Sequence, residues 1–228
     1  MRRLAVLLLS AFLFASTVKG AVAAEAARPV YRRVATEERI VALTFDDGPH
    51  PRYTHAILDL LKEYDAKATF FMIGKNVELY GDVARRVVAE GHEIGNHTYA
   101  HPTLATLPSG ALEREILEAE ALIEECTGRS TALFRPPEGY CTQAVEDVVV
   151  RNGGTVILWS IDTEDWRGRP SDEIVHTVMQ SVVPGAIILF HDYVAQKSTT
   201  VEALKEILPR LCAAGYRFVT ISELIEYS

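Results

Sequence analysis

The sequence predicts an α/β fold, a distorted (β/α) barrel with about seven parallel strands. Apolar runs of strand length alternate with amphipathic runs of helix length from about residue 39 to the end of the chain. The chain has 228 residues, a normal length for an α/β barrel. Because 48% of the residues are apolar, the chain can bury a full core.

The first residues have the pattern of a secretory signal. Arg2 and Arg3 precede an apolar run over residues 4–18, and small residues follow at 21–24. Charged, apolar and cleavage regions in this order are typical of a signal peptide. We therefore expect residues 1–24 to be a signal peptide and the protein to be secreted or associated with the cell wall. The alternative is an uncleaved membrane anchor, but the run is shorter than the roughly 20 apolar residues of a spanning helix.

The rest of the chain reads as a short arm followed by one domain. Residues 25–38 are rich in Ala, Arg and Glu, so we expect an N-terminal arm or linker there. We expect residues 39–228 to form a single domain, because no internal repeat or low-complexity tract interrupts them.

Charge and cysteine content limit the partners. Removing residues 1–24 takes away three positive charges and no negative one, so the formal net charge changes from −8 to −11. An acidic surface argues against nucleic acid and anionic lipid as partners, and it leaves a neutral glycan open. The three cysteines, Cys126, Cys141 and Cys212, have no regular spacing and do not indicate a disulfide framework. We expect all three cysteines to be small buried side chains, and a disulfide bond between two of them remains open. We expect the protein to be a monomer.

The predicted elements alternate along the domain. The expected strands are residues 40–45, 68–73, 93–95, 132–135, 155–160, 186–191 and 217–220. The expected helices are residues 51–64, 77–90, 109–126, 142–151, 171–182 and 201–213. Gly91, Gly128 and Gly215 follow helices as left-handed caps would, and Ser171 has the position of an N-cap.

Residues with catalytic chemistry lie at the carboxyl ends of these strands. They are Asp46, Asp47, His97, Arg135 and His191, with Asp165 in the loop after a further strand. In βα barrels this end of the sheet holds the active site. We therefore expect these side chains to come together.

The first two motifs predict a metal site. Asp46 and Asp47 follow an apolar strand, and His97 and His101 are four residues apart. Alone, paired acids often cap a helix and a His-x-x-x-His spacing is weak evidence. Neighbouring side chains of a strand point to opposite faces, so one acid can bind a metal while the other faces substrate. One carboxylate and two imidazoles suit a divalent metal with an open water position. We expect His92 to be a solvated surface residue, and the remaining histidines, His50, His55 and His176, to be exposed or packed.

The later motifs add a cation, an acid and a further imidazole. Arg135 begins a stiff segment with two prolines, which can aim the guanidinium at a carboxylate and turn backbone N–H groups into the cleft. Asp165, in the loop before Trp166, can raise the pKa of His191 and keep that imidazole charged. Taken singly, each has a structural alternative, such as a surface arginine or a satisfied core histidine.

In this order the motifs resemble the polysaccharide deacetylases of carbohydrate esterase family 4, the NodB-homology domain. The resemblance covers roughly residues 38–224. Five segments carry it, namely Thr44-Phe45-Asp46-Asp47-Gly48-Pro49, His97-Thr98-x-x-His101, Arg135-Pro136-Pro137, Asp162-Thr163-x-Asp165-Trp166 and Leu189-x-His191.

The resemblance implies a role for each position. Asp47, His97 and His101 would hold a divalent metal, zinc in the first place, with cobalt or nickel tolerated. Asp46 would be the general base and His191 the general acid. Arg135 would orient Asp46, and Asp165 would tune His191. The substrate-binding positions would be Pro137, Glu138, Trp166 and Leu189, with Trp166 and Leu189 lining the pocket for the acetyl methyl group. Many relatives have tyrosine where this chain has Glu138; the backbone N–H used for the oxyanion is kept, but the sugar preference is open.

We therefore expect an exported, metal-dependent N-deacetylase of an N-acetylated polysaccharide, in the first place peptidoglycan. Chitin oligosaccharides, acetylated xylan and an exopolysaccharide remain open as substrates. A non-catalytic glycan-binding module on the same fold is the main alternative from another class, and an iron oxygenase with two histidines and one carboxylate is a further one.

Overall fold

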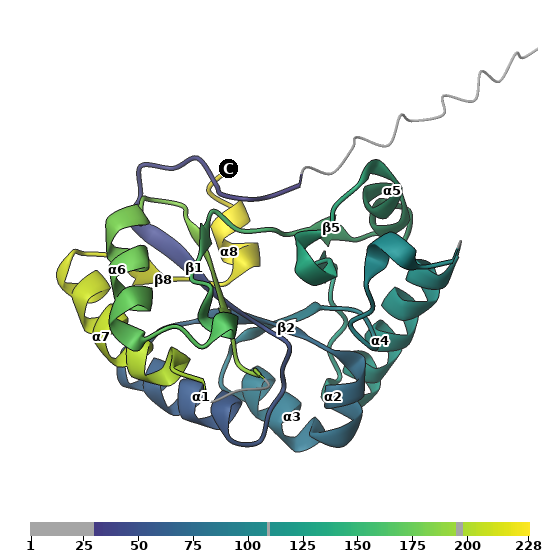
Figure 1. The fold of residues 1–228 in the computed structure, drawn as a ribbon, viewed down its shortest axis with the longest axis horizontal. Coiled ribbons are helices and arrows are strands. Elements are labelled where there is room, and N and C mark those ends of the chain that lie inside the picture. The colour runs from purple at the N-terminus through teal and green to yellow at the C-terminus, as the bar shows by residue number, and fades with distance from the viewer. Residues whose placement is uncertain (1–29, 109, 195–197) are drawn as a thin grey trace, which may run out of the picture.

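Parallel strands form the centre of the fold (Figure 1). The structure is a computed structural model that describes residues 30–108, 110–194 and 198–228. The expected signal peptide and the first part of the expected arm lie outside the described residues.

The described strands are β1 (Ile40–Asp46), β2 (Ala68–Met72), β3 (Glu93–Asn96), β4 (Leu133–Phe134), β5 (Thr155–Val156), β6 (Ile161–Asp162), β7 (Ile187–His191) and β8 (Arg217–Phe218). Seven of them follow the order β5-β4-β3-β2-β1-β7-β6, and β8 pairs with β1 off this path. Every pair of these strands is parallel. The predicted fold class, a distorted barrel of about seven parallel strands, is confirmed.

The described helices cover the outside of the curved sheet, except the last, which packs against Ile40 and Ala42 on its inner side (Figure 1). They are α1 (Tyr53–Glu63), α2 (Gly74–Leu79), α3 (Gly81–Ala89), α4 (Ala111–Thr127), α5 (Gln143–Arg151), α6 (Ser171–Ser181), α7 (Thr200–Ala213) and α8 (Ile221–Ile225). Neighbouring helices pack on one another around this layer, with α7 between α6 and α1, and α4 between α3 and α5. None of the helices in the described part of the chain combines the length and hydropathy needed to span a membrane.

The side-chain alternation of β1 separates the core from the active-site end. Leu43 and Phe45 pack in the layer between sheet and helices, where Phe45 stacks on Phe70 and Phe190 with ring centroids 5.0 and 5.6 Å apart. Thr44 and Asp46 therefore point to the interior of the barrel, because successive residues of a strand face opposite sides. The register then places Asp46 of β1 beside His191 of β7.

Three predicted elements differ in detail. The expected helix 77–90 is two helices, α2 and α3, because Tyr80 between them has non-helical angles (φ −129°, ψ 43°). The expected strand 155–160 is shorter, and β6 follows it as a separate strand. Ser171 is the first residue of α6 and not its cap, which is Pro170.

The expectations about His92 and about the burial of the three cysteines were wrong. His92 is buried and not solvated, because its Nδ1 accepts a hydrogen bond from the backbone N–H of Ala68 and its ring edge meets Phe70. The cysteines are free; Cys126 and Cys141 are only partly buried, and Cys212 is exposed. In contrast, the expected left-handed glycines are confirmed, with φ of 78° at Gly91, 68° at Gly128 and 80° at Gly215.

Candidate active site and metal centre

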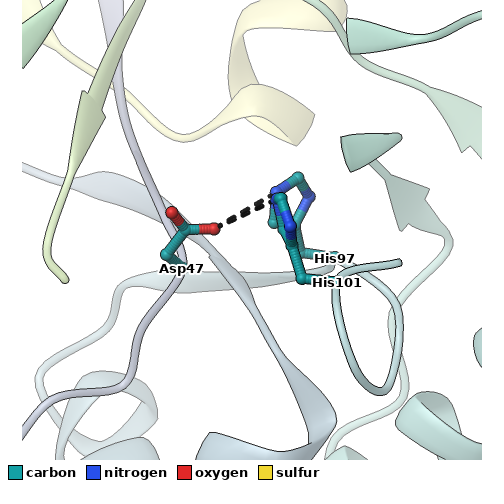
Figure 2. A group of neighbouring side chains, drawn as sticks. All are labelled: Asp47, His97 and His101. Atoms are coloured by element: carbon teal, nitrogen blue, oxygen red, sulfur yellow. Dashed lines mark ion pairs between the residues drawn. The ribbon is translucent and has the colours of Figure 1, made fainter. Parts of the chain in front are cut away.

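The carboxylates of Asp46 and Asp47 reach the same histidine, His97, from different backbone conformations. Asp46 is the last residue of β1 and is buried, whereas Asp47 turns away with φ 75°, in the left-handed region. The Oδ1 atom of Asp47 lies 3.5 Å from Nε2 of His97 and 3.5 Å from Nε2 of His101. Figure 2 shows this carboxylate facing both imidazole rings.

These three side chains have the arrangement of a metal ligand set. One ligand atom from each of Asp47, His97 and His101 lies within 4.8 Å of the others. The Asp47 Oδ1 atom is buried and accepts no hydrogen bond from any group that the structure describes. A buried carboxylate oxygen without a partner that faces two imidazole nitrogens fits a bound cation.

The protonation of His97 also suits a metal ligand. Its Nδ1 lies 2.7 Å from the carbonyl oxygen of Arg135, a contact that assigns the proton to Nδ1 and leaves the Nε2 lone pair facing Asp47. Burial lowers the pKa of His97, although the charges of Asp46 and Asp47 act in the opposite direction. The neutral imidazole that binds metals is therefore the favoured form.

The loop from His97 to His101 is held by its own side chains. Thr98 and His101 have φ of 70° and 52°, uncommon values for residues other than glycine. The Thr98 N–H donates to Asn96 Oδ1 (2.9 Å), and the His101 N–H donates to Thr98 Oγ1 (3.0 Å). These bonds stabilise a strained turn that brings both imidazoles to one side.

Arg135 holds Asp46 from behind. The guanidinium is fully buried, and its Nη1 donates to Asp46 Oδ1 (2.7 Å) and Thr44 Oγ1 (2.9 Å). Its Nε and Nη2 donate to the carbonyl oxygens of Ile157 and Leu158 (3.2 Å each). The second carboxylate oxygen of Asp46, Oδ2, lies 3.8 Å from Nε2 of His97 and therefore faces the Asp47–His97–His101 group.

His191 is paired with a buried carboxylate. Asp165 Oδ1 lies 2.7 Å from Nδ1 of His191, and Asp165 Oδ2 accepts the His191 backbone N–H (2.8 Å) and the Thr200 hydroxyl (2.6 Å). Burial alone lowers the pKa of His191, but the hydrogen bond and charge of Asp165, with the charges of Asp46 and Asp47, raise it to about 9. The imidazole is therefore protonated at neutral pH.

A pocket of about 500 Å³ contains these groups. It is lined by Asp46, Asp47, His97, His101, Glu138, Gly139, Trp159, Asp162, Trp166, Leu189 and His191. This volume is within the usual range for a small-ligand site, roughly 300–1,000 Å³. Acidic, imidazole and indole groups thus meet in one concave space.

Most residues predicted from the sequence come together here. Arg135 and Asp165 lie behind the pocket and contact Asp46 and His191, and Pro137 is buried directly before Glu138. Sequence reasoning missed Trp159 as a lining residue because it falls within an apolar run expected to be strand interior. Asp162 was part of a recognised motif but had no assigned role.

The chain is similar in sequence to known proteins. The sequence profile of the polysaccharide deacetylase family matches residues 33–157. A peptidoglycan-N-acetylglucosamine deacetylase of Bacillus cereus is 44% identical over 196 residues, covering 85% of this chain and 92% of that protein.

Two solved structures are also similar. A peptidoglycan N-acetylglucosamine deacetylase, in complex with 4-naphthalen-1-yl-N-oxidanyl-benzamide, aligns with a TM-score of 0.83 and 35% identity, covering 86% of this chain and 92% of the other. A pseudoenzyme of carbohydrate esterase family 4 from Bacillus anthracis aligns with a TM-score of 0.80 and 32% identity, covering 86% of this chain and 69% of the other.

Proposed function

The chain belongs to the polysaccharide deacetylase family, and from this premise we propose that it is an exported, metal-dependent N-deacetylase of peptidoglycan. The observation that supports the proposal best is the Asp47–His97–His101 group, which shares one pocket with Asp46 and His191. In this proposal residues 1–24 direct export, and residues 39–228 form the catalytic domain.

Asp47, His97 and His101 would hold the metal, which we propose is zinc, with cobalt or nickel as alternatives. When bound, such an ion polarises a carbonyl oxygen and lowers the pKa of water from about 15.7 to near 7. The unpartnered Oδ1 of Asp47 and the free Nε2 of His97 are the donor atoms that support this assignment.

Asp46 is the proposed general base. Its Oδ1 is held by Arg135, and its Oδ2 faces the same space as the metal ligands. In the reaction, Asp46 accepts a proton from the attacking water as the water oxygen bonds to the acetyl carbonyl carbon. The hydrogen bond from Arg135 holds the Asp46 carboxylate in place to accept that proton.

His191 is the proposed general acid. With Nδ1 bonded to Asp165, its Nε2 is the atom left to act on substrate. The carbon–nitrogen bond breaks with its electron pair on nitrogen, and His191 donates a proton to that nitrogen. The products are acetate and the free amino sugar.

The remaining groups fit the acetyl group and its developing negative charge. Glu138 has φ 57°, and within the described residues nothing accepts a hydrogen bond from its backbone N–H. This N–H is the proposed oxyanion donor, a contribution of roughly 3 kcal/mol to transition-state stabilisation in comparable sites. Trp166 and Leu189 supply apolar surface for the methyl group.

A non-catalytic glycan-binding module is the competing function. The similarity to a pseudoenzyme shows that this fold also occurs without activity. A decayed site is expected to lose at least one of its chemical groups. Here Asp46, Asp47, His97, His101 and His191 are all present and line one pocket, which favours a working enzyme.

One panel of substrates tests the proposal. Acetate release is measured from N-acetylated peptidoglycan, chitin oligomers and acetylated xylan, each with and without a chelator. We expect release from peptidoglycan that stops with chelator and returns with added zinc. Faster release from chitin oligomers or xylan would reassign the substrate, and release that persists in the chelator would reject the metal. Acetate release without oxygen separates hydrolysis from an iron oxygenase.

A further inference from the structure

Side chains that take no part in the proposed reaction hold the loop that carries Asp47. The Asn76 side chain, from α2, donates its amide N–H to the backbone carbonyl of Asp47 (2.7 Å). The Thr54 hydroxyl, from α1, accepts the backbone N–H of His50 (2.8 Å) and donates to Asp192 Oδ2 (2.5 Å). The loop is therefore tied to two helices, one on each side of Gly48.

Asp192, the residue that follows β7, completes the support. Its backbone N–H donates to the Asp46 carbonyl (3.1 Å), and its buried carboxylate packs against Gly48. A Cβ atom built on Gly48 would lie only 2.2 Å from Asp192 Oδ2, so the carboxylate occupies the space of the missing side chain. The Gly48 carbonyl in turn accepts the N–H of Ile73 (2.9 Å).

The loop needs this support because its central residue is strained. Asp47 has φ 75°, a left-handed value that is unfavourable for a residue other than glycine. Such a conformation persists only where its surroundings hold it in place. Relaxation of the backbone at Asp47 would move its carboxylate away from His97 and His101.

We propose that Asn76 and the Thr54–Asp192 pair are positioning residues that set the affinity of the metal site by fixing the backbone of Asp47. The inference rests on the proposed function, since it assumes that Asp47, His97 and His101 bind the metal. Residues that orient a metal ligand from behind commonly contribute about 10- to 100-fold to metal affinity.

The chain offers a matched set of variants. Thr54→Val removes the hydroxyl and keeps the shape, whereas Thr54→Ser keeps the hydroxyl. Asn76→Leu removes the amide donor on the other side of Gly48. Thr69→Val is the control, because Thr69 is also fully buried and its hydroxyl bonds Glu93 and the Ile221 N–H, away from the loop.

Zinc affinity is measured on the metal-free proteins by competition with a chromophoric chelator, beside thermal unfolding of each protein. We expect Thr54→Val and Asn76→Leu to weaken zinc binding by about tenfold or more, and Thr54→Ser to retain it. We expect Thr69→Val to lower the unfolding temperature without changing zinc affinity. Cobalt-loaded samples give a second readout, since displacement of Asp47 alters the visible spectrum.

The outcomes separate this inference from the proposed function. Zinc affinity in Thr54→Val or Asn76→Leu equal to that of the unaltered protein would overturn the role of that residue, even if the variant is less stable. If Thr54→Val does not fold, Asn76→Leu still decides the matter. Failure of the unaltered protein to bind zinc or cobalt would instead reject the metal centre, and the inference with it.

Discussion

The carboxylate of Asp165 binds His191 at two points, the side-chain Nδ1 (2.7 Å) and the backbone N–H (2.8 Å). This arrangement fixes the ring at the end of β7 and determines which nitrogen faces the pocket. The negative charge of Asp165 also offsets the effect of burial, so that the pKa of His191 reaches about 9.

The pH profile of catalysis tests this relationship through Asp165→Asn. His191 must be protonated to act as an acid, so activity is lost as the pH rises through its pKa. Removing the negative charge lowers that pKa, and we expect the alkaline limb of kcat/KM to move down by about one unit or more. Thr200→Val, which removes a hydrogen bond to Asp165 but no charge, should move it less. If the alkaline limb of kcat/KM stays at the same pH in Asp165→Asn, the assigned pairing of Asp165 with His191 is contradicted.

Substitutions of the metal ligands and of the acid–base residues should affect metal binding and turnover differently. We expect Asp47→Ala and His97→Ala to lose the metal and the activity together, because each removes a proposed ligand. We expect Asp46→Asn and His191→Ala to keep the metal but lose turnover by about 10²-fold or more, the usual effect of acid–base groups. Metal content by elemental analysis and acetate release decide this. Undiminished acetate release by the Asp47→Ala protein without bound metal would refute the ligand assignment.

Much of the fold and site was predictable because strand alternation and strand ends carry strong signals. The apolar run before Asp46 predicted β1 and its end, and the same reasoning located His97 and His191 at neighbouring strand ends. The break at Tyr80 was not predictable in this way, because the apolar spacing continues across α2 and α3. The short helix α8 was missed, although Thr220 and Glu223 form a capping box at its start. Contacts between distant residues, such as Thr54 with Asp192, leave no local pattern at all.

Stability should depend strongly on Arg135. Its guanidinium is fully buried, bonds Asp46 and lies over the ring of Phe71 at 4.1 Å. Arg135→Leu would leave the buried charge of Asp46 without its partner, and we expect the free energy of unfolding to fall by about 3–5 kcal/mol. Adding Asp46→Asn should restore part of the loss, because the uncompensated charge is then absent. Chemical denaturation of both variants measures this, and equal losses in the single and double variants would argue against charge pairing as the cause.

The pH dependence of stability should reveal Asp192. Burial raises the pKa of Asp192 to about 7, against the lowering effect of its hydrogen bond from Thr54. Since its ordinary pKa is about 3.9, the folded protein binds this proton more tightly than the unfolded chain, and stability falls as the pH rises from about 4 to 7. Asp192→Asn keeps an acceptor for Thr54 and removes the titration. We expect this variant to lose less stability than the unaltered protein between these pH values in urea denaturation; parallel curves would show that Asp192 does not titrate there.

Glu138 should influence which glycan is accepted. It is exposed at the pocket, and none of the described residues lining that pocket is Lys or Arg. With Asp46 paired to Arg135 and Asp47 assigned to the proposed metal, the carboxylates of Glu138 and Asp162 remain as negative charge facing a bound sugar. Such charge favours a substrate that already carries free ammonium groups, and salt screens it.

Glu138→Gln isolates this charge, because the backbone N–H proposed for the oxyanion is unchanged. We expect the variant to lose preference for partly deacetylated over fully acetylated chitin oligomers, mainly through KM, with kcat on the fully acetylated oligomer little affected. The difference from the unaltered protein should shrink at high salt. Glu125→Gln, which neutralises an exposed carboxylate on α4, serves as the control. A ratio of kcat/KM values for the two oligomers that is the same in Glu138→Gln and the unaltered protein would show that this carboxylate does not select substrate.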